Sequence, residues 1–262
     1  MVSSEVQKQR AIDTHSEQAT LFASRYDVIK QDPYQNCFVY SRKRLNEWLD
    51  QFLPPRGDGL EMLDVGCGTG YHMARYRARG FRLTGIDGSA DMLRQARELN
   101  PDIVFYQSDV DRLPVAETAF DLAFSIEVLR YLPDIQPCVR EIHRILRPGG
   151  TALVTAAPPL QASIYPPVNR LAVALKLKSL TALKQYFHSA GELERSFRAA
   201  GFQDVEVHGV YGGAMIWLER LLPASVMPGL LRGWEKIDRL TADAPVFRHF
   251  SNMFLVRAVK GK

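Results

Sequence analysis

The stretch LDVGCGTG, residues 63–70, decides the fold. The apolar run that enters it, EMLDVG at 61–66, predicts a buried strand. Its closely spaced glycines predict a tight turn, because a residue without Cβ adopts backbone angles closed to others and lets the backbone approach a ligand. The amphipathic stretch YHMARYRARG at 71–80 then predicts a helix. The segment is therefore interpreted as a strand, a glycine turn and a helix.

Outward from this segment, strand and helix patterns continue to alternate. Helices are expected at about 40–52, 89–100, 135–150 and 191–201, and the first fifty-odd residues are expected to be helical, with one helix capped by Thr14 or Ser16. Further strands are predicted at 81–88, 102–110, 120–128, 151–159, 204–211 and 251–260. Such alternation is typical of an α/β fold in which helices cover both faces of a mostly parallel sheet.

Two segments interrupt the alternation, and they set the expected organisation of the chain. Residues 160–185 are rich in Leu, Ala and Lys, and residues 212–250 carry many large apolar side chains. The expected parts are an N-terminal helical cap (1–55), a core (56–158), a helical lid insertion (159–187), the core continued (188–211), a second lid insertion (212–250) and the last core strand (251–262).

The apolar side chains of the second insertion give the main indication of the substrate. We expect them to form a roof over an apolar or aromatic substrate; packing on the sheet edge or on a second subunit, and contact with a membrane surface, are the alternatives. They are Trp217, Leu221, Leu222, Met227, Leu230, Leu231 and Trp234.

Composition narrows the class of protein. Apolar residues make up 46% and charged residues 24% of the chain, as in ordinary globular proteins. No run approaches the roughly 18 apolar residues that span a bilayer. The polar N-terminal stretch has no signal-peptide core, and three cysteines at wide spacing form neither a disulfide framework nor a metal-ligand cluster. A reduced, cytoplasmic protein without a metal site is expected.

The charge balance indicates what kind of partner to expect. Thirty-three basic residues against 29 acidic ones do not make a nucleic-acid footprint, so a nucleic acid is not expected as a partner. Residues 160–190 are locally basic, with four basic residues and no acidic one. This bias is consistent with an anionic ligand or a membrane surface, or with an ordinary solvated helix face.

Acidic residues follow the first three strands, where parallel sheets bind their ligands. Asp64 enters the glycine turn, and Asp87 after the second strand is placed to accept hydrogen bonds from paired ribose hydroxyls. Asp109 after the third strand is placed to accept one from an adenine amino group. A dinucleotide-binding fold would carry G-x-G-x-x-G, but Tyr71 stands where its third glycine would be. A nicotinamide-dependent oxidoreductase is therefore disfavoured.

With these residues the chain resembles the class I S-adenosylmethionine-dependent methyltransferases that act on small molecules. LDVGCGTG matches their first motif, and the acid of GIDGS matches the second. SDVDRLP with FDLAFSIEVLRYL, and then RILRPGG and AAGF, match later ones. The likeness covers about 60–158 and 188–210. It implies a Rossmann-like, doubly wound, mostly parallel seven-stranded sheet with an antiparallel last strand and a helical lid.

The resemblance also implies a cofactor site for S-adenosylmethionine, with S-adenosylhomocysteine as product. Asp64 would order the loop and the methionine ammonium, Asp87 would bind the ribose, and Arg42 would pair with the cofactor carboxylate. The expected cofactor-binding residues are Tyr26, Arg42, Asp64, Gly66, Gly68, Gly70, Asp87, Gly88, Met92, Asp109, Val110, Ser125 and Ile126. The alternatives are ordinary structural roles. The glycines would only form a turn, the aspartates would cap a turn or helix, Met92 would be a core residue, and Tyr26 and Arg42 would pack on the helix surface.

The reaction implied is methyl transfer to an O, N or C atom of a small molecule. Alignment of the reacting groups alone can lower the activation free energy of such reactions by about 7–11 kcal/mol. A base is needed only if the acceptor must lose a proton. The catalytic candidates are Glu127, Arg130 and His188, with His15, Tyr131 and Tyr211 behind them; a dedicated base is not required. Members of the resembling family often carry a histidine near position 130.

The roles of these candidates stay open at this point. The arginine at position 130 is suited to an anionic carboxylate or phosphate of the substrate. Each of the three also has a structural alternative to a catalytic role. Glu127 would order the loop, Arg130 would form a surface ion pair and His188 would cap a helix. RNA methylation, or methylation of a lipid or quinone precursor on the same fold, is the alternative function.

Overall fold

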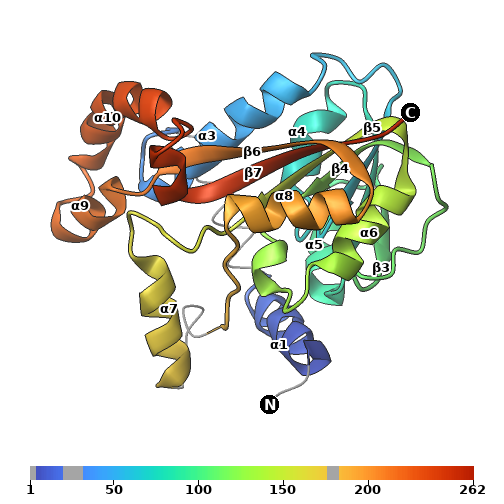
Figure 1. The fold of residues 1–262 in the computed structure, drawn as a ribbon, viewed down its shortest axis with the longest axis horizontal. Helices are drawn as coiled ribbons and strands as arrows, with labels where there is room; N and C mark the ends of the chain where they lie inside the picture. Colours follow the sequence, from blue (N-terminus) through green and yellow to red (C-terminus); the bar gives the residue numbers. More distant parts are fainter. Residues whose placement is uncertain (1–3, 20–31, 176–182) are drawn as a thin grey trace.

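The sheet has the predicted architecture. The computed structural model describes residues 4–19, 32–175 and 183–262, and it places seven strands in the order β3-β2-β1-β4-β5-β7-β6 (Figure 1). Strands β1 to β5 pair in parallel, whereas β7 is antiparallel to both β5 and β6. The strands are β1 (Glu61–Val65), β2 (Arg82–Asp87), β3 (Val104–Gln107), β4 (Phe120–Ser125), β5 (Leu146–Ala156), β6 (Phe202–Gly212) and β7 (Ser251–Lys260). The predicted Rossmann-like fold class is confirmed.

Helices cover both faces of this sheet. The α-helices with described bounds are α1 (Ser4–Glu17), α3 (Cys37–Phe52), α4 (Tyr71–Arg77), α5 (Ala90–Leu99), α6 (Gln136–Ile145), α7 (Tyr165–Ala174), α8 (Ala190–Ala199), α9 (Met215–Leu221) and α10 (Met227–Thr241); the short 3₁₀ turns are η1 (Leu129–Tyr131) and η3 (Phe247–Phe250). Within the described ranges, no helix combines the length and apolar character needed to cross a bilayer.

Two local predictions differ from the structure. The first helix runs over Ser4–Glu17 instead of beginning near Thr14 or Ser16. The helix expected over about 135–150 ends at Ile145, because β5 already begins at Leu146, which pairs with Phe120. A shift of register between Phe120 and Leu122 accommodates residues 147–150 in the strand.

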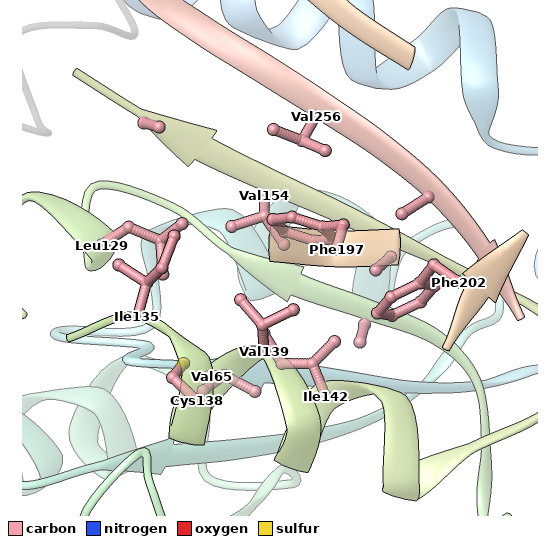
Figure 2. Packing of buried hydrophobic residues seen from close by; sticks show 14 of the residues in the cluster. Val65, Leu129, Ile135, Cys138, Val139, Ile142, Val154, Phe197, Phe202 and Val256 are labelled. Atoms are coloured by element: carbon pink, nitrogen blue, oxygen red, sulfur yellow. The ribbon is translucent and has the colours of Figure 1, made fainter. Parts of the chain in front are cut away.

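One face of the sheet is closed by α6 and α8. Cys138, Val139, Ile142 and Ile145 recur at helical spacing on α6 and are fully buried. They pack with Phe197 of α8 and with strand residues such as Val154 and Val256 (Figure 2). Helix α8 starts with a capping box between Ser189 and Glu192, which satisfies two amide groups of its first turn.

The opposite face is closed by α3. Asn36 caps this helix through a 2.9 Å hydrogen bond from the Val39 amide to Asn36 Oδ1. Leu45 and Leu49 are fully buried against Phe124 and other strand residues. Since α3 leads from the sheet face to the carboxyl ends of the strands, it brings Arg42 to the edge where ligands bind.

The second insertion packs against α3 instead of roofing the ligand site. Met227 and Leu231 of α10 are buried with Cys37 and Tyr40 of α3, and Leu221 of α9 is 79% exposed. None of the seven apolar residues expected to form the roof lines the cavity described below, to which this segment contributes Ile216 and Glu219. The roof prediction is therefore wrong, because α10 uses its apolar stripe to bury the start of α3.

Candidate active site

A cavity of about 550 Å³ lies at the carboxyl ends of β1, β2, β3 and β4. The strand order reverses between β1 and β4, which is where open α/β sheets bind ligands. The volume is within the range of small-molecule sites. Side chains from α1, α3, η1, α7, α9 and β7 complete its walls.

The glycine turn after β1 divides into positions that face the cavity and one that does not. Gly66, Gly68 and Gly70 all have positive φ, at 77°, 53° and 75°. A Cβ on Gly68 would meet no atom within 4 Å, so this glycine borders open cavity. A Cβ on Gly70 would lie 2.8 Å from Asn100 Nδ2, so Gly70 provides clearance for α5. Gly70, expected to bind the cofactor, does not line the cavity.

Asp87 ties the glycine turn to β2. Its carboxylate accepts hydrogen bonds from the amides of Gly68 (2.9 Å) and Ser89 (2.8 Å). Burial raises the pKa of Asp87 although these amide bonds act in the opposite direction. The carboxylate is therefore fixed in orientation at the cavity wall, next to Gly88 and Met92, which also line the cavity.

Asp64 is a buried carboxyl group, and no partner in the described ranges offsets the cost of burying its charge. Burial, and then the charge of Asp87, raise its pKa to about 7. None of the described residues donates a hydrogen bond to it. Two acids that line one end of the cavity thus favour a ligand that brings positive charge or hydroxyl donors.

Asp64→Asn is expected to change the pH dependence of folding. A carboxyl whose pKa rises from 3.8 to about 7 on folding stabilises the folded state below its unfolded pKa, and this contribution is lost as pH rises through 7. The stability of the variant relative to wild type should therefore increase between about pH 4 and 7, by at most about 4 kcal/mol, and stay level above. Thermal unfolding across this range is the measurement. A pH-independent difference would contradict the assignment.

Helix α1 forms the wall over the end of β3. Lys8 pairs with Asp109 at 2.7 Å and with Asp111 at 2.6 Å. Ile12 lies on Gly88, since a Cβ there would come within 2.8 Å of its Cδ1. Asp109 and Val110 line the cavity, as do Lys8, Ala11, Ile12 and His15 of this helix. Of the cavity-lining residues of this helix, the sequence indicated only His15, because no motif marks Lys8, Ala11 or Ile12.

The far wall is built on Glu127, between two arginines. Glu127 Oε1 accepts a hydrogen bond from Arg42 Nη2 at 3.1 Å, and Oε2 accepts one from Arg130 Nη1. Burial alone would raise the pKa of Glu127, but Arg130 and Arg42 hold it below its ordinary value. The residue has a φ of 65° and its amide donates to Thr155 Oγ1 at 2.6 Å. The turn after β4 is thus held in a left-handed conformation that a non-glycine residue adopts at a cost.

Of the remaining predicted residues, some line the cavity and others do not. Ile126 lines the cavity, whereas Ser125 is fully buried below it and donates to the Val65 carbonyl at 3.0 Å. His188 does not line the cavity; its amide donates to the Ala157 carbonyl at 2.9 Å, and burial lowers its pKa. Tyr26 lies outside the described residues. The lining set also includes His15, Tyr131 and Tyr211.

His72 lines the cavity, and its surroundings disfavour the protonated imidazole. Burial first, and then the charges of Arg42 and Arg75, lower its pKa to about 3. Both ring nitrogens are buried and have no hydrogen-bond partner within the described part of the chain. An imidazole whose pKa is this low is a weak general base at neutral pH.

His72→Leu is expected to stabilise the free protein. Removing a buried polar group without a partner saves about 1–3 kcal/mol of desolvation cost. The free energy of unfolding in urea should rise by an amount in this range, whereas the same replacement at exposed His249 should leave it unchanged. A fall for His72→Leu would mean that the imidazole stabilises the fold.

The residues of this cavity fit a charged nucleoside. The acids at the ends of β1 and β2 suit a cationic amino group and ribose hydroxyls, and the open space at Gly68 admits a ligand against the backbone. Arg42 on the far wall suits a carboxylate. The bulk of the cavity lining outside these groups is apolar or aromatic, including Phe38, Met92, Tyr131 and Tyr211.

Comparison with known proteins gives one family match and several partial relatives. Residues 63–154 match a methyltransferase domain. A malonyl-[acyl-carrier protein] O-methyltransferase of Pectobacterium atrosepticum is 36% identical over 98 residues, which are 37% of this chain and 39% of that protein. The chain thus spans about two fifths of the length of this curated relative.

The fold likeness extends further than the sequence likeness. A SAM-dependent methyltransferase of Thermotoga maritima superimposes with a TM-score of 0.63 at 17% identity, over 94% of this chain and 97% of that one. A phosphoethanolamine N-methyltransferase of Haemonchus contortus, solved with S-adenosyl-L-methionine, superimposes with a TM-score of 0.58 at 22% identity. The superposition covers 84% of this chain and 53% of that one. At such identities these structures establish a shared fold.

Proposed function

Because residues 63–154 are a methyltransferase domain within the fold of the class I S-adenosylmethionine-dependent methyltransferases, we propose that this chain transfers a methyl group from S-adenosylmethionine to a small-molecule acceptor. One observation carries the proposal. The carboxylate of Asp87 is fixed by the amide of Gly68 at the edge of a cavity that also contains Asp64 and Arg42. These groups match the ribose, the ammonium and the carboxylate of that cofactor.

The residues that would hold the cofactor lie along the ends of β1, β2 and β3. Asp87 would accept hydrogen bonds from the ribose, and Asp109 and Val110 would border the adenine near Met92. Asp64 would pair with the ammonium, which removes the cost of its buried charge. Arg42 would pair with the carboxylate from the far wall.

When bound, the cofactor supplies an activated methyl group on a sulfonium. The residues of this chain then have to position an acceptor and exclude water from it. Glu127 is already shared between two arginines and its pKa is lowered, so it is a weak proton acceptor. His188 lies off the cavity. We therefore propose that catalysis relies mainly on proximity and alignment.

Methyl transfer can be tested without knowing the acceptor. The purified chain is incubated with S-adenosylmethionine labelled in its methyl group and with a fractionated cell extract. We expect label in the small-molecule fraction together with S-adenosylhomocysteine, and neither with Asp87→Ala. Label confined to RNA would assign another acceptor class, and absence of transfer to every fraction would overturn the proposal.

A further inference from the structure

The two ends of the cavity differ in charge. Asp64 and Asp87 line the end near β1 and β2. At the far wall, Arg42 and Arg130 both pair with the single carboxylate of Glu127. Glu219 also lines the cavity, but its carboxylate accepts a hydrogen bond from the Cys37 amide at the start of α3 (2.9 Å).

One arginine would be sufficient to neutralise Glu127. A second guanidinium within a partly buried wall costs desolvation energy unless an anion compensates it. Arg42 is 8% exposed and its guanidinium lies 5.1 Å from the centre of the Phe38 ring. Arg130 is 20% exposed and lines the same cavity.

Arg130 offers more donors than Glu127 uses. Its Nη1 donates to Glu127, and no further side-chain hydrogen bond to it occurs within the described part of the chain. An arginine has five N–H donors in a planar fork that matches carboxylate and phosphate oxygens. The remaining N–H groups are therefore available to a ligand in the cavity.

Three phenols line the same cavity as this guanidinium. Tyr131, Tyr165 and Tyr211 are close enough to Arg130 to interact with it electrostatically. Burial raises the pKa of Tyr131 and of Tyr211 to about 12, so both hydroxyls keep their protons at neutral pH. Gln185 Nε2 donates to Tyr165 Oη at 2.8 Å and orients that ring.

We propose that Arg130, together with the phenols of Tyr165 and Tyr211, binds an anionic carboxylate or phosphate group of the methyl acceptor. This inference rests on the proposed function and adds the substrate class. The arginine supplies the charge and the forked donors, and the phenols, which line the same cavity, supply neutral donors. Arg42 remains with the cofactor carboxylate, so the two arginines serve two different anions.

The subsite is tested by calorimetric titration of small anions into the full chain, with and without saturating S-adenosylhomocysteine. The probes are malonate, inorganic phosphate and the neutral analogue malonamide. We expect one anion to bind with millimolar affinity and malonamide not to bind. Preference for malonate assigns a carboxylate, and preference for phosphate assigns a phosphate. Equal binding of malonamide, or binding of neither anion, overturns the subsite.

Variants locate the site. Arg130→Gln should weaken binding of the anion at least tenfold and leave the affinity for S-adenosylhomocysteine within about threefold, whereas Arg140→Gln, on the exposed face of α6, should change neither. Tyr165→Phe removes one hydroxyl and should weaken binding of the anion about threefold to tenfold. This second variant keeps the test valid if Arg130→Gln does not fold.

The outcomes distinguish a failure of the anion subsite from a failure of the proposed methyltransferase function. Unchanged anion affinity in Arg130→Gln and Tyr165→Phe overturns the subsite while the proposed function stands. Loss of S-adenosylhomocysteine binding in Arg130→Gln also overturns it, since this arginine would then belong to the cofactor. If wild type binds the anion at Arg130 but no S-adenosylhomocysteine, the subsite stands and the proposed function fails.

Discussion

Asp87→Ala is expected to weaken the binding of S-adenosylhomocysteine by a hundredfold or more. In the proposed complex the carboxylate accepts hydrogen bonds from both ribose hydroxyls. Hydrogen bonds to a charged group are worth about 1.5–3 kcal/mol each, so two of them correspond to roughly 10²- to 10⁴-fold in affinity. The same carboxylate holds the amides of Gly68 and Ser89, and its loss also loosens the glycine turn.

Titration calorimetry on three proteins measures this effect. Asp87→Asn keeps the shape of the side chain and should fall between wild type and Asp87→Ala. Asp91→Ala, four residues away on α5, removes a carboxylate that is 51% exposed and pairs with Arg94, and it should bind like wild type. An affinity of Asp87→Ala within a few-fold of wild type would show that the ribose lies elsewhere.

Asp238→Ala is expected to lower the free energy of unfolding by about 3–5 kcal/mol, the usual cost of breaking a buried charged pair. Asp238 is fully buried on α10, where it accepts hydrogen bonds from Tyr40 Oη (2.6 Å), Arg44 Nε (3.1 Å) and the Gly212 amide (2.6 Å). Removing it leaves the Tyr40 hydroxyl, the Gly212 amide and the Nε of Arg44 without their acceptor, although Arg44 keeps its pair with Glu47. This single carboxylate joins α3, β6 and α10.

Urea denaturation followed by circular dichroism measures the loss. Asp204→Ala removes a surface carboxylate that is 57% exposed and pairs with Arg257, so it should change stability by less than about 1 kcal/mol. Similar losses in the two variants would mean that the network around Asp238 does not hold the second insertion in place. Because Arg42 is on α3, we also expect Asp238→Ala to weaken cofactor binding.

The sequence was sufficient to predict the sheet and the acids at its edge. Strand segments of alternating or continuous apolar residues, separated by helices with a 3.6-residue repeat, have few arrangements, and the carboxyl ends of parallel strands must meet at one edge. Asp64, Asp87 and Asp109 follow three such strands, and the structure places all three at the cavity. Their roles toward a cofactor stay predictions.

The remainder depends on contacts between distant segments. Nothing in the sequence of α1 indicates that Lys8 pairs with Asp109, more than a hundred residues away. The apolar residues of α10 suit a ligand roof as well as a helix contact, and packing with Cys37 and Tyr40 decides between them. Gly70 belongs to the motif by its spacing, but its φ of 75° and its proximity to Asn100 give it a packing role.

Titration calorimetry of the wild-type chain tests the central claim most directly. With the cavity built as described, S-adenosylhomocysteine should bind at one site per chain with micromolar affinity, and NAD should produce no heat of binding. Binding of NAD without S-adenosylhomocysteine, or of neither, would contradict the assignment of the cavity beside Asp64 and Asp87 to this nucleoside.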